Sequence, residues 1–306
     1  MNINLIKFQI LEELYKYKKI TAVAEALNLK QPTVTFHLKA MEKDFGVKLF
    51  ETRCGKIILT EAGEAIYHYA SKINALALEA ARVAKEYDSG KGTIKIGASY
   101  VPATYLLPNI LSDYTNKNPM VSISLNVKTS PTVLEMLQKH EIDIGIISSE
   151  SFELPNIMSQ ALIEDEMVVF FSKRHPLAAH TFLNPELLAK SSLILHGEQS
   201  STRDITLKWL KNSGIIINTK MELNSLEAIK RIILQGNYIS VISKLAIEQE
   251  LTEGSLTYRK LPWAETLLTK RSIYYAINMD RQKSSALTNF INYLSDSNIY
   301  TFLPLN

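Results

Sequence analysis

The chain has 306 residues, of which 46% are hydrophobic and 21% are charged. This length exceeds one ordinary hydrophobic core, so two or three domains are expected. No apolar run approaches the roughly 20 residues that span a bilayer, and the N-terminus lacks the basic and apolar pattern of a secretory signal. We therefore expect a cytoplasmic protein with no membrane partner. Its single cysteine, Cys54, excludes an intrachain disulfide and a cysteine-cluster metal site.

Positive charge is concentrated at the start of the chain. The formal net charge is +3, yet the first 60 residues hold ten Lys or Arg against six Asp or Glu, and the remainder holds 24 against 25. This bias is expected where a segment meets phosphate, although short basic segments are often only solvated surfaces.

Apolar spacing predicts three helices before residue 46. The first is indicated by four residues that recur at helical spacing, Ile6, Ile10, Leu14 and Tyr17. A short helix over about 21–28 follows. A third begins at Pro32, since proline suits only the first turn of a helix.

The third helix is expected to turn Phe36 outward among threonines and lysines. Such a face suits a major groove, where lysine reaches phosphate, glutamine or threonine bonds base edges, and an apolar group touches a thymine methyl. Periodicity alone leaves open an ordinary three-helix core with one exposed aromatic. The candidate DNA contacts here are Lys30, Gln31, Pro32, Thr33, Thr35, Phe36 and Lys39, with Lys30 and Lys39 assigned to phosphate.

A wing is predicted after this helix. Gly46 is a plausible C-cap, and two short strands over 48–50 and 56–59 flank a turn. Arg53 and Lys56 lie at its tip, where they can contact the DNA backbone or minor groove. Cys54 is interpreted as an unreactive loop thiol.

The ordered residues of this segment resemble LysR-type transcriptional regulators. The resemblance runs through VAEALNLKQPTVT at 23–35, LKAME at 38–42, FGVKLFE at 45–51 and LTEAG at 59–63. It implies a recognition helix that starts at Gln31 and Pro32, a wing that ends at Thr60, and promoter double-stranded DNA as the partner. Lys30 departs from the serine of many members. It loses a helix cap but can still reach phosphate by charge.

Residues 61–87 lack proline and are rich in alanine, which predicts one long helix. Its apolar residues form a heptad seam: Ala62, Ile66, Tyr69, Ile73, Leu76, Ala80, Val83 and Tyr87. The seam could lie on the chain's own domain or pair with a copy of itself. The resemblance favours a homodimer, and by extension a homotetramer, with RNA polymerase as a further candidate partner. Residues 88–92 read as a hinge.

From residue 93, strand and helix patterns alternate, which predicts α/β structure with parallel sheets and helices on both faces. Expected strands cover 93–98, 120–128, 142–147, 167–171, 192–196, 220–223, 239–242 and 271–277, the last returning to the first sheet. Expected helices cover 102–117 and 131–139 or begin near 184, 202, 225 and 284.

The predicted fold is therefore an N-terminal all-α winged helix-turn-helix, a long linker helix and a two-lobed effector domain. The expected domains are 1–60, 61–90 and 91–306, with lobe I over 91–162 and 268–306 and lobe II over 163–267. This effector domain resembles that of the LysR family and, through it, periplasmic binding proteins. The resemblance implies that an effector changes the angle between the lobes and so the DNA bend.

Polar residues follow the predicted strands, where ligands bind in open α/β sheets. The candidate effector contacts are Ser99, Tyr100, Val101, Pro102, Thr129, Ser130, Pro131, Ser200, Ser201, Thr202, Arg203 and Asn224. Hydroxyls beside helix N-termini favour a small anion or carboxylate, although each serine or threonine alone is more often a helix cap.

Two other classes of function are less consistent with the sequence. An enzyme is disfavoured because no Gly-x-Ser-x-Gly elbow, P-loop or GxGxxG motif occurs. The six histidines lack metal-ligand spacing, so no cofactor is expected. An architectural DNA-binding protein without a ligand would need a filled cleft between the lobes.

Overall fold

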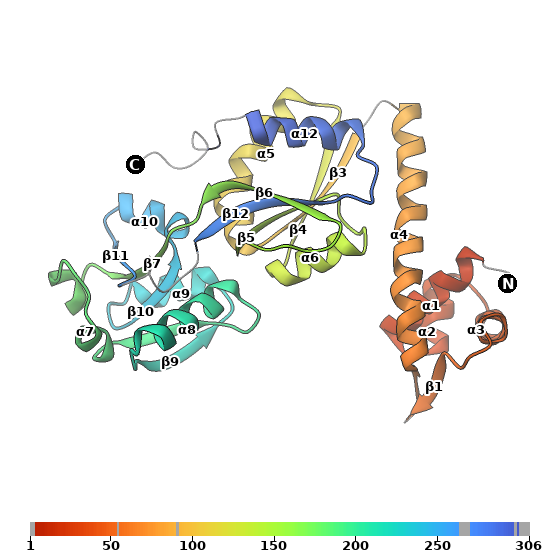
Figure 1. The fold of residues 1–306 in the computed structure, drawn as a ribbon, viewed down its shortest axis with the longest axis horizontal. Helices are drawn as coiled ribbons and strands as arrows, with labels where there is room; N and C mark the ends of the chain where they lie inside the picture. Colours follow the sequence, from red (N-terminus) through yellow and green to blue (C-terminus); the bar gives the residue numbers. More distant parts are fainter. Residues whose placement is uncertain (1–3, 54, 90–91, 263–269, 297–298, 300–306) are drawn as a thin grey trace. The chain divides into compact units, whose positions relative to one another are not determined.

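The computed structural model describes residues 4–53, 55–89, 92–262, 270–296 and 299. The chain divides into two compact units, Met1–Gly90 with Lys139–Glu141, and Lys91–Gln138 with Ile142–Asn306 (Figure 1). Cys54, interpreted above as an unreactive thiol, and Gly90 and Lys91 of the predicted hinge lie outside the described residues.

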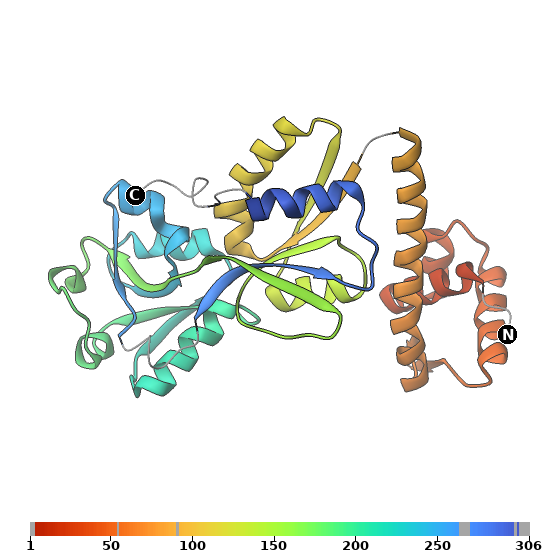
Figure 2. The same cartoon turned by 45° about the horizontal axis from the view of Figure 1, so that its top comes forward.

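The first unit is a winged helix-turn-helix followed by one long helix, as predicted (Figures 1 and 2). Its elements are α1 (Leu5–Tyr17), α2 (Ile20–Ala26), α3 (Gln31–Phe45), the wing strands β1 (Phe50–Arg53) and β2 (Lys56–Leu59), and α4 (Glu61–Ser89). Buried side chains from the first three helices pack together: Ile10, Leu14, Val23, Ala24, Val34 and Leu38.

α1 buries a broader face than its spacing predicted. Phe8 and Leu11 are buried in a second cluster with residues of α3 and α4, because α1 packs against α2 and α3 on one side and α4 on another. Tyr17, placed on the apolar face by its spacing, is 40% exposed. It is the last residue of α1, and Lys18 ends the helix with a φ of 57°.

Local turn chemistry shapes the end of α3 and the wing. Gly46, at a φ of 70°, closes α3 as predicted, and its N–H donates to the Glu42 carbonyl at 2.9 Å. β1 pairs antiparallel with β2. β1 begins at Phe50, later than predicted. The Leu49 N–H instead donates to Glu42 Oε1 at 2.9 Å, which holds that residue against α3.

The second unit contains two five-stranded sheets. The first lobe has the strand order β4-β3-β5-β12-β6, with helices on both faces as predicted. α5 and α12 bury residues such as Ile110 and Phe290 on one face, and α6 buries Val133 and Leu137 on the other. Its elements are β3 (Gly92–Ala98), the π-helical turn η1 (Pro102–Leu106), α5 (Leu107–Lys117), β4 (Val121–Val127), α6 (Ser130–Gln138), β5 (Ile144–Glu150), β6 (Ile157–Glu164), β12 (Arg271–Asn278) and α12 (Ser285–Asp296).

The second lobe has the strand order β11-β7-β10-β8-β9. Its strands are β7 (Met167–Ser172), β8 (Ser192–His196), β9 (Asn218–Leu223), β10 (Ile239–Ser243) and β11 (Leu256–Lys260). Its helices are α7 (Pro185–Ala189), α8 (Ser201–Ser213), α9 (Leu226–Ile233) and α10 (Glu248–Thr252), with short turns η2 (Pro176–Ala179) and η3 (Lys244–Ile247). Trp209 of α8 is fully buried in its core.

The prediction of parallel sheets is correct only in part. β3 is parallel to β4 and β5, and β8 is parallel to β9 and β10. β12 returns to the first sheet, as expected, but runs antiparallel to β5 and to β6, which was not predicted. β7 is antiparallel to β10 and to β11, which was also not predicted. β12 enters from the second lobe, so it starts beside the end of β5 and runs the opposite way.

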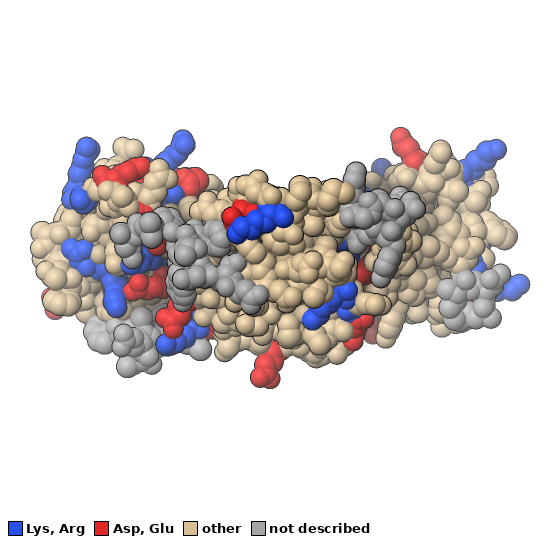
Figure 3. All heavy atoms as spheres, turned by 90° about the horizontal axis from the view of Figure 1, so that it is seen from above, with Lys and Arg blue, Asp and Glu red and all other residues tan. Residues whose placement is uncertain are grey.

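Charge on one face of the molecule is mixed. Figure 3 shows Lys and Arg interspersed with Asp and Glu, and no broad field of one sign forms on that face.

Candidate DNA-binding face and effector pocket

The structure places the predicted DNA contacts of α3 on one surface. Gln31, Pro32 and Lys39 are exposed, and Phe36 is 68% exposed. Thr33 and Thr35 are half-buried on its flanks. The opposite side buries Val34, Leu38 and Met41, so an aromatic ring stands in solvent although the helix has a well-formed apolar face.

The start of α3 leaves its side chains available. Lys30 precedes the helix in an extended conformation and gives no side-chain cap. The Thr35 hydroxyl donates to the Gln31 carbonyl at 3.1 Å, so it can only accept a further hydrogen bond. Within the described residues the Gln31 side chain makes no hydrogen bond, which leaves its amide free for a base edge.

Both predicted basic residues of the wing, Arg53 and Lys56, are exposed. Arg53 Nη2 lies 2.7 Å from Glu51 Oε1, and the two side chains are 69% and 40% exposed. Exposed pairs of this kind contribute little free energy. Arg53 can therefore exchange Glu51 for a phosphate at small cost.

A cavity of about 240 Å³ lies where β3, β4, β8 and β9 end in the second unit. Nine of the twelve predicted effector contacts line it: Ser99, Tyr100, Val101, Thr129, Ser130, Ser200, Ser201, Thr202 and Asn224. Strand ends and helix starts from both lobes thus meet around one space.

Three predicted contacts are not among the lining residues. Pro102 is buried at the start of η1, and Pro131 is exposed on α6. Arg203 donates from Nη1 to the His196 carbonyl at 2.9 Å and pairs with Glu222 at 2.7 Å. These bonds hold its charge at the β8–β9 edge.

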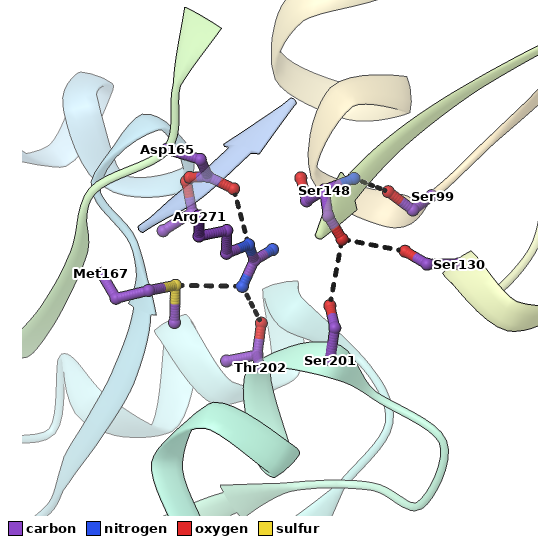
Figure 4. A network of polar contacts seen from close by, with 9 residues as sticks. Ser99, Ser130, Ser148, Asp165, Met167, Ser201, Thr202 and Arg271 are labelled. Atoms are coloured by element: carbon purple, nitrogen blue, oxygen red, sulfur yellow. Dashed lines mark hydrogen bonds and ion pairs between the residues drawn. The ribbon is translucent and has the colours of Figure 1, made fainter. Parts of the chain in front are cut away.

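The backbone of Ser148 forms hydrogen bonds with three serines of the pocket (Figure 4). The Ser148 carbonyl accepts the hydroxyls of Ser130, at 3.1 Å, and Ser201, at 3.5 Å. The Ser148 N–H donates to Ser99 Oγ at 3.0 Å. Ser130 and Ser201 have thus used their protons, whereas Ser99 keeps its proton for another acceptor.

Two family models match the chain. Residues 5–64 match the bacterial regulatory helix-turn-helix protein model of the lysR family, and residues 88–298 match the LysR substrate binding domain. The chain belongs to the LysR family of transcriptional regulators.

Individual relatives of this LysR-type regulator agree in length. It is 30% identical over 290 residues to a probable RuBisCO transcriptional regulator of Porphyra purpurea, covering 93% of this chain and 90% of that protein. Full-length CbnR complexed with its target DNA superposes with a TM-score of 0.67 at 19% identity, over 96% of this chain and 99% of CbnR, and shows the shared fold. The Synechocystis PCC6803 CcmR regulatory domain in complex with 2-PG gives a TM-score of 0.60 at 25% identity, over 67% of this chain and 96% of CcmR.

Sequence reasoning missed several pocket residues of this LysR-type regulator: His196, Gly197, Glu198, Gln199, Leu223, Leu226 and Arg271. Most of them adjoin segments that were predicted, so a wider window at each strand end would have found them. Arg271 lies far along the chain at the start of β12, and no local pattern marked it. It is buried, and its Nε lies 2.9 Å from Asp165 Oδ2.

His196 lines the pocket as an uncharged side chain. It is buried, and its Nε2 lies 2.9 Å from the Val241 carbonyl, which can only accept. Nε2 therefore carries the proton. Burial lowers the pKa of His196 to about 4; the hydrogen bond to the Val241 carbonyl opposes this shift, and the positive charge of Arg271 adds to it. The ring is therefore uncharged at neutral pH.

Acid should destabilise the second unit through His196. In the unfolded chain, His196 binds a proton below its ordinary pKa of about 6.5. In the folded chain it binds a proton only near pH 4, so stability falls as the pH drops between these values. We expect this residue to remove about 3 kcal/mol of folding free energy between pH 7 and pH 4. Urea unfolding across this range should show a shallower acid slope for His196→Gln than for the wild type. Equal slopes would contradict a buried neutral ring.

Among the described residues, no helix is both long and apolar enough to cross a membrane. The same residues contain no group of three or more His, Cys, Asp or Glu side chains placed to hold a metal ion.

Proposed function

We propose that this LysR-type regulator binds promoter DNA sequence-specifically as a homodimer, through α3 and the wing, under the control of a small anionic effector in the pocket. It acts by binding and not by turnover. The observation that carries the effector class is that the Ser99 hydroxyl and the uncapped first turn of α8 border the cavity as hydrogen-bond donors.

The donors come from several elements. Ser99 keeps its hydroxyl proton because it accepts from Ser148. α8 begins at Ser201 with no side-chain cap from Ser200, so the first amides of that helix have no partner within it. Partial positive charge at such a helix start favours an anion. Among the described lining residues, the one carboxylate is that of Glu198, which is exposed to solvent.

The size of the cavity suits a small effector. With a volume of about 240 Å³, it has room for a small carboxylate or phosphate ester. The CcmR regulatory domain, which shares this fold at 25% identity, was solved with 2-PG, and this supports a small ligand of the same kind.

The helix α4 supports the homodimer. Tyr69, Ile73 and Leu76 of the predicted seam are 63%, 39% and 43% exposed, and Ala80 is exposed as well. Apolar residues on one stripe of a long helix are suited to a second copy of that stripe. Two recognition helices on adjacent half-sites would then demand a partly palindromic operator. Assembly into a tetramer and a change of DNA bend on effector binding extend this proposal by family resemblance.

The effector class is tested by thermal unfolding of the full chain with 2-PG, with inorganic phosphate and with uncharged glycerol. Ligands that bind only the folded state raise the melting temperature. We expect the melting temperature to rise with the concentration of each of the two anions. Glycerol should raise it no more than it raises the melting temperature of an unrelated control protein. A rise confined to uncharged ligands would overturn the anionic class.

Gln31→Ala tests sequence reading by α3. Its free amide is expected to bond a base edge, so the variant should lose about 1–3 kcal/mol of binding free energy on the operator and much less on random DNA. Fluorescence anisotropy with both duplexes at one salt concentration measures the difference. An equal loss on both duplexes would remove Gln31 from sequence reading.

Arg53→Ala tests the wing. If Arg53 leaves Glu51 for a phosphate, the variant should weaken all duplexes alike and lower the slope of log affinity against log salt by about one contact. Lys211→Ala, an exposed basic residue of α8, serves as the control and should keep the wild-type slope. An unchanged slope for Arg53→Ala would exclude this phosphate contact.

A further inference from the structure

We propose that Arg271 receives the negatively charged group of the effector, together with the first turn of α8. This inference rests on the proposed function of the pocket and names the residue that selects an anion there. Arg271 begins β12 opposite Glu150, the last residue of β5. The crossing strand thus delivers a guanidinium to the strand ends that surround the cavity.

The protein does not occupy all the N–H donors of the Arg271 guanidinium. Its side chain is 3% exposed. Nη1 donates to Met167 Sδ at 3.0 Å and to Thr202 Oγ1 at 3.3 Å, and Nε faces Asp165. Nη2 has no partner among the described residues, and Figure 4 shows it directed to the side of Ser148 and Ser201. A thioether is a weak acceptor. The buried guanidinium of Arg271 therefore keeps N–H donors that can bind a ligand in the cavity.

Asp165 acts as a positioning residue. Its Oδ1 accepts a short hydrogen bond from the Ser243 hydroxyl, and its Oδ2 lies 2.9 Å from Arg271 Nε. Asp165 and Ser243 are both buried. This contact is an ion pair without hydrogen-bond geometry, so Asp165 holds the guanidinium in place by its charge, and among the described residues nothing hydrogen-bonds to Nη2.

The start of α8 completes the site. Thr202 Oγ1 accepts from Arg271 Nη1 and no described residue accepts its proton, so that proton can be donated to a ligand. The first amides of α8, at Ser201, Thr202 and Arg203, have no partner within the helix. An oxyanion held between Nη2, the Thr202 hydroxyl and these amides would meet donors from both lobes. Carboxylate and phosphate oxygens match guanidinium N–H groups in geometry and charge.

The test measures binding of inorganic phosphate to the full chain by titration calorimetry. Arg271→Lys keeps the charge beside Asp165 but removes Nη2, and we expect it to bind phosphate about tenfold or more weakly, as for loss of a charged hydrogen bond. Arg281→Lys is the matched control. Arg281 is equally buried and pairs with Asp143 at 2.6 Å, but it does not line the pocket. This variant should bind phosphate within about twofold of the wild type, a limit set by the expected independence of distant sites.

A second variant guards against misfolding. Arg271→Met combined with Asp165→Asn removes both charges together, so that no buried charge is left unpaired. It should fold, by circular dichroism, and lose phosphate affinity at least as strongly as Arg271→Lys.

The outcomes separate this inference from the proposed function. Wild-type affinity in either Arg271 variant overturns the role of Arg271 and leaves an anionic effector standing. A similar loss in Arg281→Lys also overturns it, because the effect would then reflect general destabilisation. A wild-type chain that takes up neither phosphate nor 2-PG at millimolar concentration overturns both the inference and the anionic class.

Discussion

Leu76→Glu is expected to convert the regulator to a monomer and to weaken operator binding by about 100-fold or more. Leu76 is 43% exposed on the seam of α4, next to Ile73 at 39%. In a symmetric pair, each copy would bury a glutamate against its partner's apolar seam, which is costly without a counter-charge. The affinity falls because the second recognition helix no longer benefits from the high effective concentration that linkage provides.

Leu78→Glu is the matched control for this prediction. Leu78 is 65% exposed on the same helix, but residues two apart on a helix point to different sides. The same substitution should therefore leave the dimer and its DNA affinity near wild type. Sedimentation velocity gives the mass, and anisotropy on an operator with two half-sites gives the affinity. A Leu76→Glu protein that stays dimeric would show that the exposed seam is not the dimer contact.

Trp209→Ala is expected to remove about 3–5 kcal/mol of folding free energy from the second unit, as large-to-small substitutions in packed cores do. Trp209 is 1% exposed, and its Nε1 donates to the Pro262 carbonyl at 2.9 Å. It packs in the cluster that joins α8 to β7 and β10. The cavity left behind and the unsatisfied carbonyl both destabilise the helix whose first turn borders the pocket.

Urea unfolding followed by circular dichroism measures this loss. Trp209→Phe retains most of the packed volume and loses the hydrogen bond, so it should cost clearly less than Trp209→Ala. Equal costs for the two variants would mean that the hydrogen bond, and not the packing, dominates at this site.

Local patterns in the sequence were sufficient for the winged helix-turn-helix. Helical spacing predicted α1 and α3, Pro32 predicted where α3 begins, and Gly46 predicted where it ends. Each of these signals acts within one or two turns of the chain, so it can be read without knowledge of the rest of the fold. The outward position of Phe36 follows from the same spacing, because the residues opposite it form the apolar face.

Local patterns also located most of the residues that line the cavity. A strand that ends in serine or threonine just before a helix is a short-range signal, and parallel strands carry such ends to the same edge of a sheet. Ser99, Ser130 and Ser201 were found in this way. Whether each hydroxyl keeps its proton was not readable, because that depends on the Ser148 backbone, which lies elsewhere in the sequence.

By itself, then, the sequence determined most of the helices, the wing, the family and most of the strand ends that line the cavity, since each depends on neighbours along the chain. Only the tertiary structure decided that β6 and β11 are strands, that β12 runs antiparallel, and that Arg271 meets Asp165 and Thr202 beside the cavity. These features arise where the chain crosses between lobes. Their partners are brought together by strand pairing over long sequence separations, and no periodicity within a single segment records such a pairing.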